Sequence, residues 1–332
     1  MNKDDFKDIK LFVGPMTKNV VDSTIDFCEK FNVKLGFIPS RRQIEFDTSG
    51  YVNNWRTRTF KNYVKDRTDK ISIIRDHGGP NQGLDEDDGF ASMFQDCNHF
   101  DVIHVDVWKK YKDFEIGSNK TVEYIKYCNS INKEILFEVG TEEGIRKTTV
   151  LELDYLMQDL KENLPENVFN KIIYLVIQDG TALKESNNIG SYDNVKLKEM
   201  LKICNKYGVL SKTHNGDYLN VADIHDRFNN GLNAINIAPE FGQIETNAIL
   251  TVIGNDAYTF NKFYDICFNS GRWEKWVDDS FVPEDNKTEL IKICGHYVIS
   301  NPDIEKITHY FKKKISDIVK EEMFKKMSCI LK

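Results

Sequence analysis

Histidine and carboxylate side chains stand at the ends of several short apolar segments, where they could hold a metal ion or transfer a proton. Asp76 and His77 directly follow one β-branched segment, Glu138 lies within another, and His214 follows a third. Borderline divalent metals such as zinc accept neutral imidazole together with carboxylate. We therefore predict that His77, Glu138 and His214 bind zinc, with manganese or magnesium as alternatives, and that Asp76 is the general acid or base. Taken singly, each histidine could instead be structural, and Asp76 could simply orient His77.

Other polar residues near the ends of these segments could bind a substrate. Arg41 and Arg42 form a pair, and a guanidinium group can hold a phosphate through two parallel hydrogen bonds. His104 lies inside a segment, and its role stays open. Lys212 shares a strand face with His214, and a lysine in a desolvated interior could form a Schiff base. The predicted substrate-binding residues are Arg41, Arg42, Gln43, Asp106, Gln178 and Asn236.

The elements that must position these residues alternate along the chain between short strands and helices. The predicted strands cover 10–14, 33–38, 71–75, 102–106, 135–139, 172–177, 209–213 and 234–237. Apolar residues at helical spacing predict helices over 20–31, 52–65, 89–98, 121–132, 150–160, 195–207, 221–228 and 241–252. Such alternation builds a parallel sheet, and eight repeats predict an α/β fold of the closed (β/α)8 TIM-barrel type. An open doubly wound sheet is the alternative, but no GxGxxG follows the first strand.

The barrel places the candidate residues together, because active sites of this fold lie at the carboxyl ends of the strands. We assign residues 1–255 to the barrel. Residues 256–332 lack strand signals and contain aromatic segments with helical spacing. We predict that they form a helical C-terminal extension packed on the barrel, with an oligomer interface as the alternative.

Composition and charge exclude several classes of protein. The 332 residues include 45 basic and 52 acidic side chains, so the net charge of −7 predicts no nucleic-acid partner. No apolar run approaches the roughly 20 residues that a membrane span requires, and no secretory signal is visible at the N-terminus. Seven scattered cysteines without a CxxC pair suit reduced thiols. We therefore expect a cytoplasmic protein.

Several short motifs occur in the order found in a known family. Asp-His-Gly-Gly-Pro-Asn at 76–81 resembles the D-H-x-G-P-N signature of class II D-tagatose-1,6-bisphosphate aldolases, in particular their large, so-called non-catalytic or accessory subunit. Ile-His-Val-Asp at 103–106 resembles I-H-L-D of the same family. The resemblance runs from about residue 30 to about residue 300, and its other segments are 43–59, 140–142, 178–188, 214–218 and the aromatic segment 273–277.

This resemblance implies a TIM barrel, a divalent metal and aldol chemistry on a sugar phosphate. It assigns the acid/base role to Asp76 and metal-ligand roles to His77, His214 and Glu138. The wider class II aldolase family has a third metal-binding histidine after the sixth strand, whereas this chain has Gln178 and Asp179 there.

We therefore predict a metal-dependent, aldolase-type lyase that cleaves or forms a C–C bond in a phosphorylated or acidic sugar. A non-catalytic accessory subunit that stabilises a separate aldolase is one alternative. A metal-dependent sugar-phosphate epimerase or isomerase is another. A homo-oligomer or a partner aldolase subunit is left open.

Overall fold

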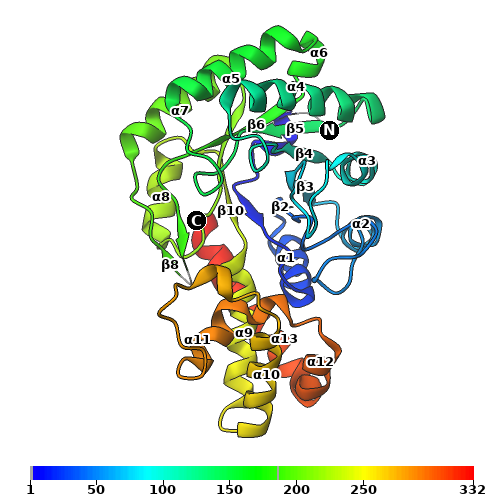
Figure 1. Cartoon of the computed structure of the whole chain (residues 1–332), viewed down its shortest axis with the longest axis vertical. Coiled ribbons are helices and arrows are strands. Elements are labelled where there is room, and N and C mark those ends of the chain that lie inside the picture. Colours follow the sequence, from blue (N-terminus) through cyan, green and yellow to red (C-terminus); the bar gives the residue numbers. More distant parts are fainter. Residues whose placement is uncertain (1–2, 185–186) are drawn as a thin grey trace.

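Eight parallel strands form a closed barrel in the computed structural model, which describes residues 3–184 and 187–332 (Figure 1). The first strand pairs with the second and also with the last, and this pairing closes the sheet and confirms the predicted TIM barrel. The strands are β1 (Leu11–Val13), β2 (Leu35–Phe37), β3 (Ile71–Gly78), β4 (Val102–Val105), β5 (Leu136–Val139), β6 (Ile172–Ile177), β9 (Leu210–Thr213) and β10 (Ala234–Ile237).

Helices surround the barrel, and side-chain caps fix where many of them begin. A capping box at Thr149 and Glu152 starts one helix, and Thr17 and Asp113 cap two others through their side-chain oxygens. The helices are α1 (Lys18–Phe31), α2 (Thr57–Lys65), α3 (Phe90–His99), α4 (Phe114–Ile131), α5 (Val150–Asn163), α6 (Glu166–Phe169), α7 (Asn194–Tyr207), α8 (Val221–Asn229) and α9 (Pro239–Ile253).

Two small elements complete this part of the chain. A 3-10 helix, η1 (Lys3–Phe6), precedes β1, and the strands β7 (Leu183–Lys184) and β8 (Asn187–Asn188) form a hairpin after β6. The hairpin belongs to the 178–188 segment of the family resemblance. Glu185 and Ser186 of that segment lie outside the described residues.

An apolar layer fills the barrel at its amino-terminal end. Phe6 and Phe12 both contact the ring of Tyr174 edge to face. Gly36 leaves room for this layer, since a Cβ atom there would lie 2.0 Å from the Phe12 ring. These side chains close the amino-terminal end of the interior, and a cavity with a polar lining is expected at the carboxyl ends of the strands.

The C-terminal residues form the predicted helical extension, which lies at one end of the molecule (Figure 1). Its last helix returns to the barrel and packs against α1, α8 and α9, where Phe324 contacts Phe27 at a centroid distance of 5.2 Å. The elements are α10 (Ala257–Asn269), η2 (Glu274–Trp276), α11 (Lys287–Cys294), η3 (Gly295–Tyr297), α12 (Pro302–Thr308), η4 (His309–Phe311) and α13 (Lys312–Leu331).

Two general features of the chain agree with the sequence. All seven cysteines belong to the described residues, none of them forms a disulfide, and six of them are buried. No helix in the described ranges is both long enough and apolar enough to cross a membrane.

The structure departs from the predicted elements after β2. The helix predicted over 52–65 begins only at Thr57, because the preceding residues form a loop closed by its own backbone hydrogen bonds. The N–H of Tyr51 donates to the carbonyl of Arg42, and the N–H of Val52 donates to the carbonyl of Gln43. Local apolar spacing cannot reveal such a closure.

A buried ion pair fastens this loop to the barrel. Arg75 on β3 and Asp96 on α3 are both 0% exposed, and the closest nitrogen and oxygen are 2.6 Å apart. Arg75 also donates to the carbonyls of Pro39 and Ile44. The pair therefore holds the start of the loop that carries Arg41 and Arg42.

Replacing Asp96 with alanine leaves the Arg75 guanidinium buried without its counter-charge. We expect Asp96→Ala to lower the free energy of unfolding by about 3–5 kcal/mol, measured by urea denaturation. The control is Asp85→Ala in an exposed loop, which we expect to change that free energy by less than about 0.5 kcal/mol. Equal stability of the two variants would contradict the anchoring role of the pair.

Candidate functional site

Four of the predicted site residues, Asp76, His77, His214 and Asn236, line one cavity of about 220 Å³ at the carboxyl ends of the strands. The carboxyl ends of β3 and β10 and the segments after β2, β5 and β9 contribute to its wall, as the barrel fold requires. Its polar lining includes Asp76, His77, Glu142, His214, Asp217, Asn236 and Lys275.

His77 reaches the cavity through an irregular end of β3. The pairing of β3 with β4 shifts register between Arg75 and Gly78, and His77 has a φ of +49°. Nonglycine residues rarely adopt this left-handed conformation, which persists only where the surroundings enforce it. Here the Nδ1–H of His77 donates to Asp106 Oδ2 at 2.6 Å, so Nε2 faces the cavity.

The carboxylates around His77 control its charge. Nε2 lies 3.6 Å from Asp76 Oδ2 and 3.8 Å from Glu142 Oε2. Burial disfavours the imidazolium, but the charges of Asp76, Asp106 and Glu142 outweigh it and raise the pKa of His77 to about 10. A proton therefore occupies Nε2 in the metal-free chain, and a bound cation would have to replace it.

His214 is oriented by a second buried carboxylate. Its Nε2–H donates to Glu138 Oε1 at 2.8 Å, which turns Nδ1 toward the cavity, 3.9 Å from Asp76 Oδ1. Burial lowers the pKa of His214 despite the negative charge of Glu138. This imidazole is therefore neutral and presents a lone pair to the cavity.

Glu138 is itself paired with a buried lysine. Its Oε2 accepts from Lys212 Nζ at 2.6 Å, and both side chains are 0% exposed. Burial opposes the carboxylate, yet Lys212 and the nearby histidines lower the pKa of Glu138 to about 2. Because each oxygen of Glu138 already accepts a hydrogen bond, this arrangement favours a positioning role over the predicted ligand role. The ammonium of Lys212 is likewise engaged, which does not favour a Schiff base.

His104, whose role the sequence left open, lies beside the other two histidines. Its ring centroid is 5.1 Å from that of His77 and 5.0 Å from that of His214. Its Nδ1 accepts the backbone N–H of His77, and its Nε2–H donates to the carbonyl of Gly140. Both nitrogens are thus occupied, so His104 supports the loop that carries His77.

Asp76 stands at the centre of the cluster. Ligand atoms of Asp76, His77, His104 and His214 all lie within 4.8 Å of one another. Asp76 Oδ1 is buried and has no hydrogen-bond partner among the described residues. Burial opposes its charge, but the surrounding histidines hold the pKa of Asp76 well below its usual range. An ionised carboxylate therefore faces the cavity.

The predicted substrate-binding residues separate into two groups. Asn236 lines the cavity, and neither atom of its side-chain amide has a partner in the described part of the chain. Arg42 lines a neighbouring cavity. The other four are buried and hydrogen-bonded within the protein: Arg41, Gln43, Asp106 and Gln178.

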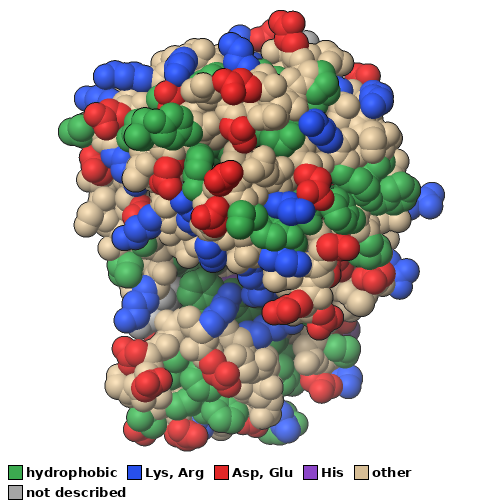
Figure 2. Space-filling model, turned by 45° about the horizontal axis from the view of Figure 1, so that its top comes forward, with side chains coloured by type: hydrophobic (Ala, Val, Ile, Leu, Met, Phe, Trp, Pro, Cys, Tyr) green, Lys and Arg blue, Asp and Glu red, His purple; other side chains and the backbone are tan. Residues whose placement is uncertain are grey.

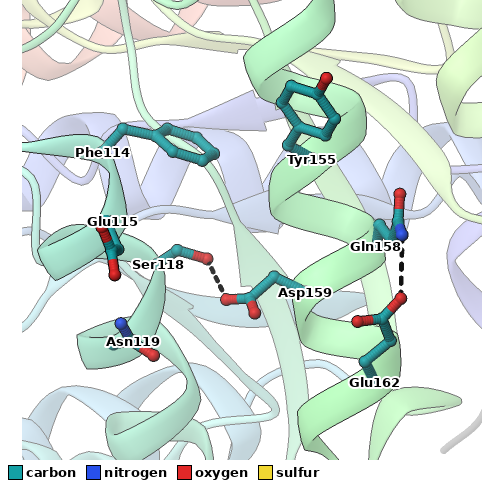
Figure 3. A pocket seen from close by; sticks show the side chains of 8 residues that line it. All are labelled: Phe114, Glu115, Ser118, Asn119, Tyr155, Gln158, Asp159 and Glu162. Atoms are coloured by element: carbon teal, nitrogen blue, oxygen red, sulfur yellow. Dashed lines mark hydrogen bonds between the residues drawn. The ribbon is translucent and has the colours of Figure 1, made fainter.

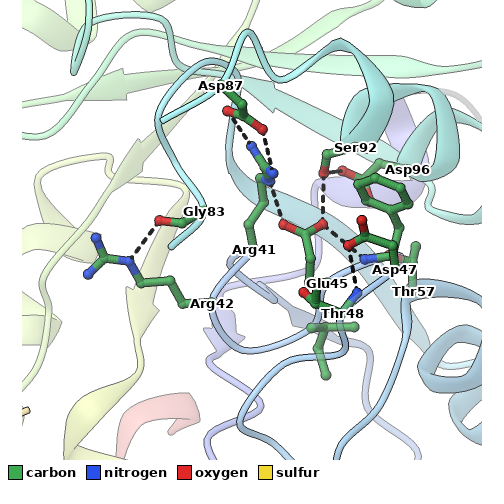
Figure 4. Close-up of polar contacts among 12 residues, drawn as sticks. Arg41, Arg42, Glu45, Asp47, Thr48, Thr57, Gly83, Asp87, Ser92 and Asp96 are labelled. Atoms are coloured by element: carbon green, nitrogen blue, oxygen red, sulfur yellow. Dashed lines mark hydrogen bonds and ion pairs between the residues drawn. The ribbon is translucent and has the colours of Figure 1, made fainter. Parts of the chain in front are cut away.

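Arg41 and Arg42 illustrate this separation. Figure 4 shows the guanidinium of Arg41 between Glu45 and Asp87, at distances of 2.8 and 2.7 Å, whereas Arg42 turns away toward the carbonyl of Gly83. The carboxylates already neutralise Arg41. Of the two arginines predicted to bind phosphate, Arg42 therefore remains the candidate, because the charge of Arg41 is already paired.

Several residues that line the cavity were not predicted as site residues, among them Asp217, Glu142 and Lys275. Glu142 follows the fifth strand in the sequence, and a carboxylate at that position could have identified it as a candidate site residue. Lys275 belongs to η2 in the extension and lines the same cavity. Lys275 lies in the 273–277 segment of the family resemblance, but only the return of the extension to the barrel brings it to the cavity.

A wider groove of about 510 Å³ lies far from this chemistry, on the outer helices (Figure 3). Phe114 and Tyr155 face each other across it from α4 and α5, and Ser118 donates to Asp159 at its floor. The groove contains no histidine, so its size alone does not make it the candidate site.

No protein-family model and no curated protein matches this sequence. Solved structures do share its fold. A probable tagatose 6 phosphate kinase from Sinorhizobium meliloti 1021 aligns over 97% of this chain and 99% of its own, with 12% identity and a TM-score of 0.74. Because that alignment covers nearly both whole chains, the similarity extends into the C-terminal helices.

Two aldolases are also similar in structure. The fructose-bisphosphate aldolase from Campylobacter jejuni aligns over 97% of this chain and 88% of its own, with 12% identity and a TM-score of 0.58. The YdjI aldolase from Escherichia coli K12 aligns over 92% and 93%, with 12% identity and a TM-score of 0.53. At such low identity these similarities show a shared fold.

The pairing of Glu138 with Lys212 can be tested by a double-mutant cycle. Lys212→Met leaves a buried carboxylate unpaired, and we expect it to lower the free energy of unfolding by about 3–5 kcal/mol. Adding Glu138→Gln removes that charge, so we expect the double variant to be more stable than the sum of the two single changes predicts. Additive effects in urea denaturation would show that the two groups are not coupled.

The pH dependence of the free energy of unfolding provides an independent test of the charge on Glu138. The folded pKa of Glu138 is lowered to about 2, whereas an unfolded glutamate titrates near about 4.3. Its contribution is therefore present above about 4.3 and is lost as the pH falls through the folded value. We expect the stability difference between the wild type and Glu138→Gln to shrink across that window.

Proposed function

We propose that this chain is a metal-dependent, aldolase-type lyase that acts on a phosphorylated or acidic sugar. One observation carries the proposal. His77 and His214 each have one ring nitrogen held by a buried carboxylate, and their other nitrogens face Asp76 and Glu142 in one cavity. Carboxylates that orient metal-binding histidines in this way are typical of the outer shell of metal sites.

The donor atoms suit a divalent cation. His77 Nε2, His214 Nδ1 and a Glu142 oxygen would hold it, and this mixture of imidazole and carboxylate fits zinc or manganese. Asp106 and Glu138 position the two imidazoles. A bound cation would polarise the carbonyl of a ketose as a Lewis acid and stabilise the developing enediolate charge.

Asp76 is the residue proposed to move the proton. Its ionised, unpartnered Oδ1 can accept the proton of a substrate hydroxyl as the adjacent C–C bond breaks. In the synthetic direction the same oxygen returns that proton. Asn236 offers an unpartnered amide donor and acceptor to the hydroxyl groups of the sugar.

The names of two structural neighbours support the substrate class. One neighbour is named for tagatose 6-phosphate and another for fructose bisphosphate, although the first is called a kinase and the second an aldolase. The shared chemistry is a phosphorylated sugar. Lys275, which lines the candidate cavity, is a cation suited to such a ligand.

A non-catalytic accessory role is the second candidate. Both ring nitrogens of His104 are hydrogen-bonded within the protein, which leaves two imidazoles, those of His77 and His214, facing the cavity. The wider family resemblance implies three metal-binding histidines, and this difference favours the accessory role. Sugar-phosphate cleavage by the purified, metal-loaded chain alone would exclude this role. Analysis of the products would also distinguish cleavage from the inversion or isomerisation that an epimerase or isomerase gives.

Two variants separate metal binding from proton transfer. We expect His77→Ala to lose both bound metal and turnover, because it removes a ligand. Asp76→Asn should keep the metal and lower kcat by about 10²–10⁴-fold, because it removes the acid/base group alone. Metal content is measured by elemental analysis, and turnover by the release of triose phosphate.

The matched control is His99→Ala on α3, whose Nδ1 is hydrogen-bonded to the carbonyl of Gln95 and which is not among the residues that line the cavity. It should retain both metal and turnover. A His77→Ala variant that keeps a full equivalent of metal would refute the proposed ligand set.

A further inference from the structure

A second cavity of about 260 Å³ adjoins the candidate site and carries basic side chains. Arg42, Arg272 and Lys275 line it, and Lys275 also lines the cavity of the histidines. Lys275 therefore forms part of the wall of both cavities. A ligand that extends from the histidines past Lys275 would place its far end among these cations.

None of the three basic groups forms an ion pair within the described residues. No carboxylate oxygen lies within ion-pair distance of their nitrogens in residues 3–184 and 187–332, although Glu274 lines the same cavity. Arg42 uses only its Nε–H, on the carbonyl of Gly83. This contrasts with the adjacent Arg41, whose charge Glu45 and Asp87 already neutralise.

Aromatic rings hold Arg272 in place. Its guanidinium carbon lies 5.0 Å from the ring centroid of Tyr51 and 5.6 Å from that of Tyr297. Stacking on aromatic faces restrains the planar group while leaving its N–H edges free. Such a restrained fork can bind an oxyanion at a smaller entropic cost than a free side chain.

The electrostatic environment of Lys275 reflects this excess of positive charge. Although its side chain reaches the surface, partial desolvation and the charges of Arg42, Arg272 and Lys109 lower the pKa of Lys275 to about 8. Like charges brought together without a counter-ion are unfavourable, and an anion bound among them would relieve that cost.

These cations come from parts of the sequence that are far apart. Arg42 follows β2 and Lys109 follows β4, whereas Arg272 and Lys275 belong to the segment between α10 and α11. Figure 2 shows basic side chains gathered around the hollow between the barrel and the extension. The overall charge of the chain is −7, so this local excess is not a property of the composition.

We propose that the second cavity is a phosphate subsite, in which Arg42, Arg272 and Lys275 bind the terminal phosphate monoester of the substrate. The inference rests on the proposed function, because the rest of that substrate would occupy the cavity of the histidines. A phosphate dianion offers several acceptor oxygens to the two guanidinium forks, and Lys275 adds a third cation on the side of the reacting carbons.

The test measures binding without requiring turnover. The probes are glycerol 3-phosphate, glycerol and inorganic phosphate, each titrated calorimetrically into the full-length chain. We expect glycerol 3-phosphate to bind and glycerol not to bind. Arg272→Gln and Arg42→Gln should each weaken binding of the phosphate ester by about 10- to 100-fold, the loss expected for a charge-assisted hydrogen bond.

A matched variant controls for general loss of charge. Lys262 is exposed on α10 of the same extension, outside both cavities, and Lys262→Gln should bind the phosphate ester as the wild type does. Denaturation curves show whether each variant is folded. Equal binding of the ester by the wild type and both arginine variants would overturn the subsite, as would equal binding of glycerol and its phosphate.

The subsite and the lyase proposal fail in different ways. His77→Ala should lose metal but still bind inorganic phosphate, which supports the subsite independently of catalysis. If the enzyme cleaves phosphorylated and unphosphorylated sugars equally well, and Arg272→Gln leaves the KM for the phosphorylated one unchanged, the subsite is refuted while the lyase remains. Phosphate binding without cleavage would refute the lyase and retain the subsite.

Discussion

The need to pair every buried charge organises the mouth of this barrel. Lys212 lies in the interior beneath the cavity and is compensated by Glu138. That pairing commits one oxygen of Glu138, and the other oxygen orients His214. The charge of Lys212 in the barrel interior thus determines, through Glu138, how the His214 ring is oriented toward the cavity. Because a buried ion costs several kcal/mol unless it is paired, roughly as much as a domain's whole stability margin, the arrangement is held tightly.

The same requirement operates at β3, with backbone strain added to it. The left-handed conformation of His77 is held from two sides, since Asp106 accepts its Nδ1–H and His104 accepts its backbone N–H. Arg75, two residues earlier, anchors the neighbouring loop through Asp96. Irregular backbone therefore lies directly beside a fully buried ion pair. Strain of this kind is found where a side chain must be aimed at a ligand.

The C-terminal extension contributes to the site as well as to the core. Its apolar residues join those of the barrel in one cluster, and α13 packs against α1 and α9. Trp273 and Trp276, which flank Lys275, pack against the same cluster, and Lys275 lines the cavity at the strand ends. The barrel supplies the groups proposed for bond cleavage, and the extension supplies cations suited to a charged substituent. The proposed reaction and the proposed phosphate binding therefore depend on different parts of the fold.

The sequence by itself determined the barrel, the helical extension and the positions of Asp76, His77 and His214 at strand ends. These follow from local patterns, because apolar periodicity specifies each element and parallel strands bring their carboxyl ends to one rim. Only the tertiary structure decided that Glu138 meets Lys212, that Arg41 pairs with carboxylates while Arg42 turns to the carbonyl of Gly83, and that Lys275 joins the site. Such outcomes depend on distances between side chains far apart in the chain, which local periodicity does not encode.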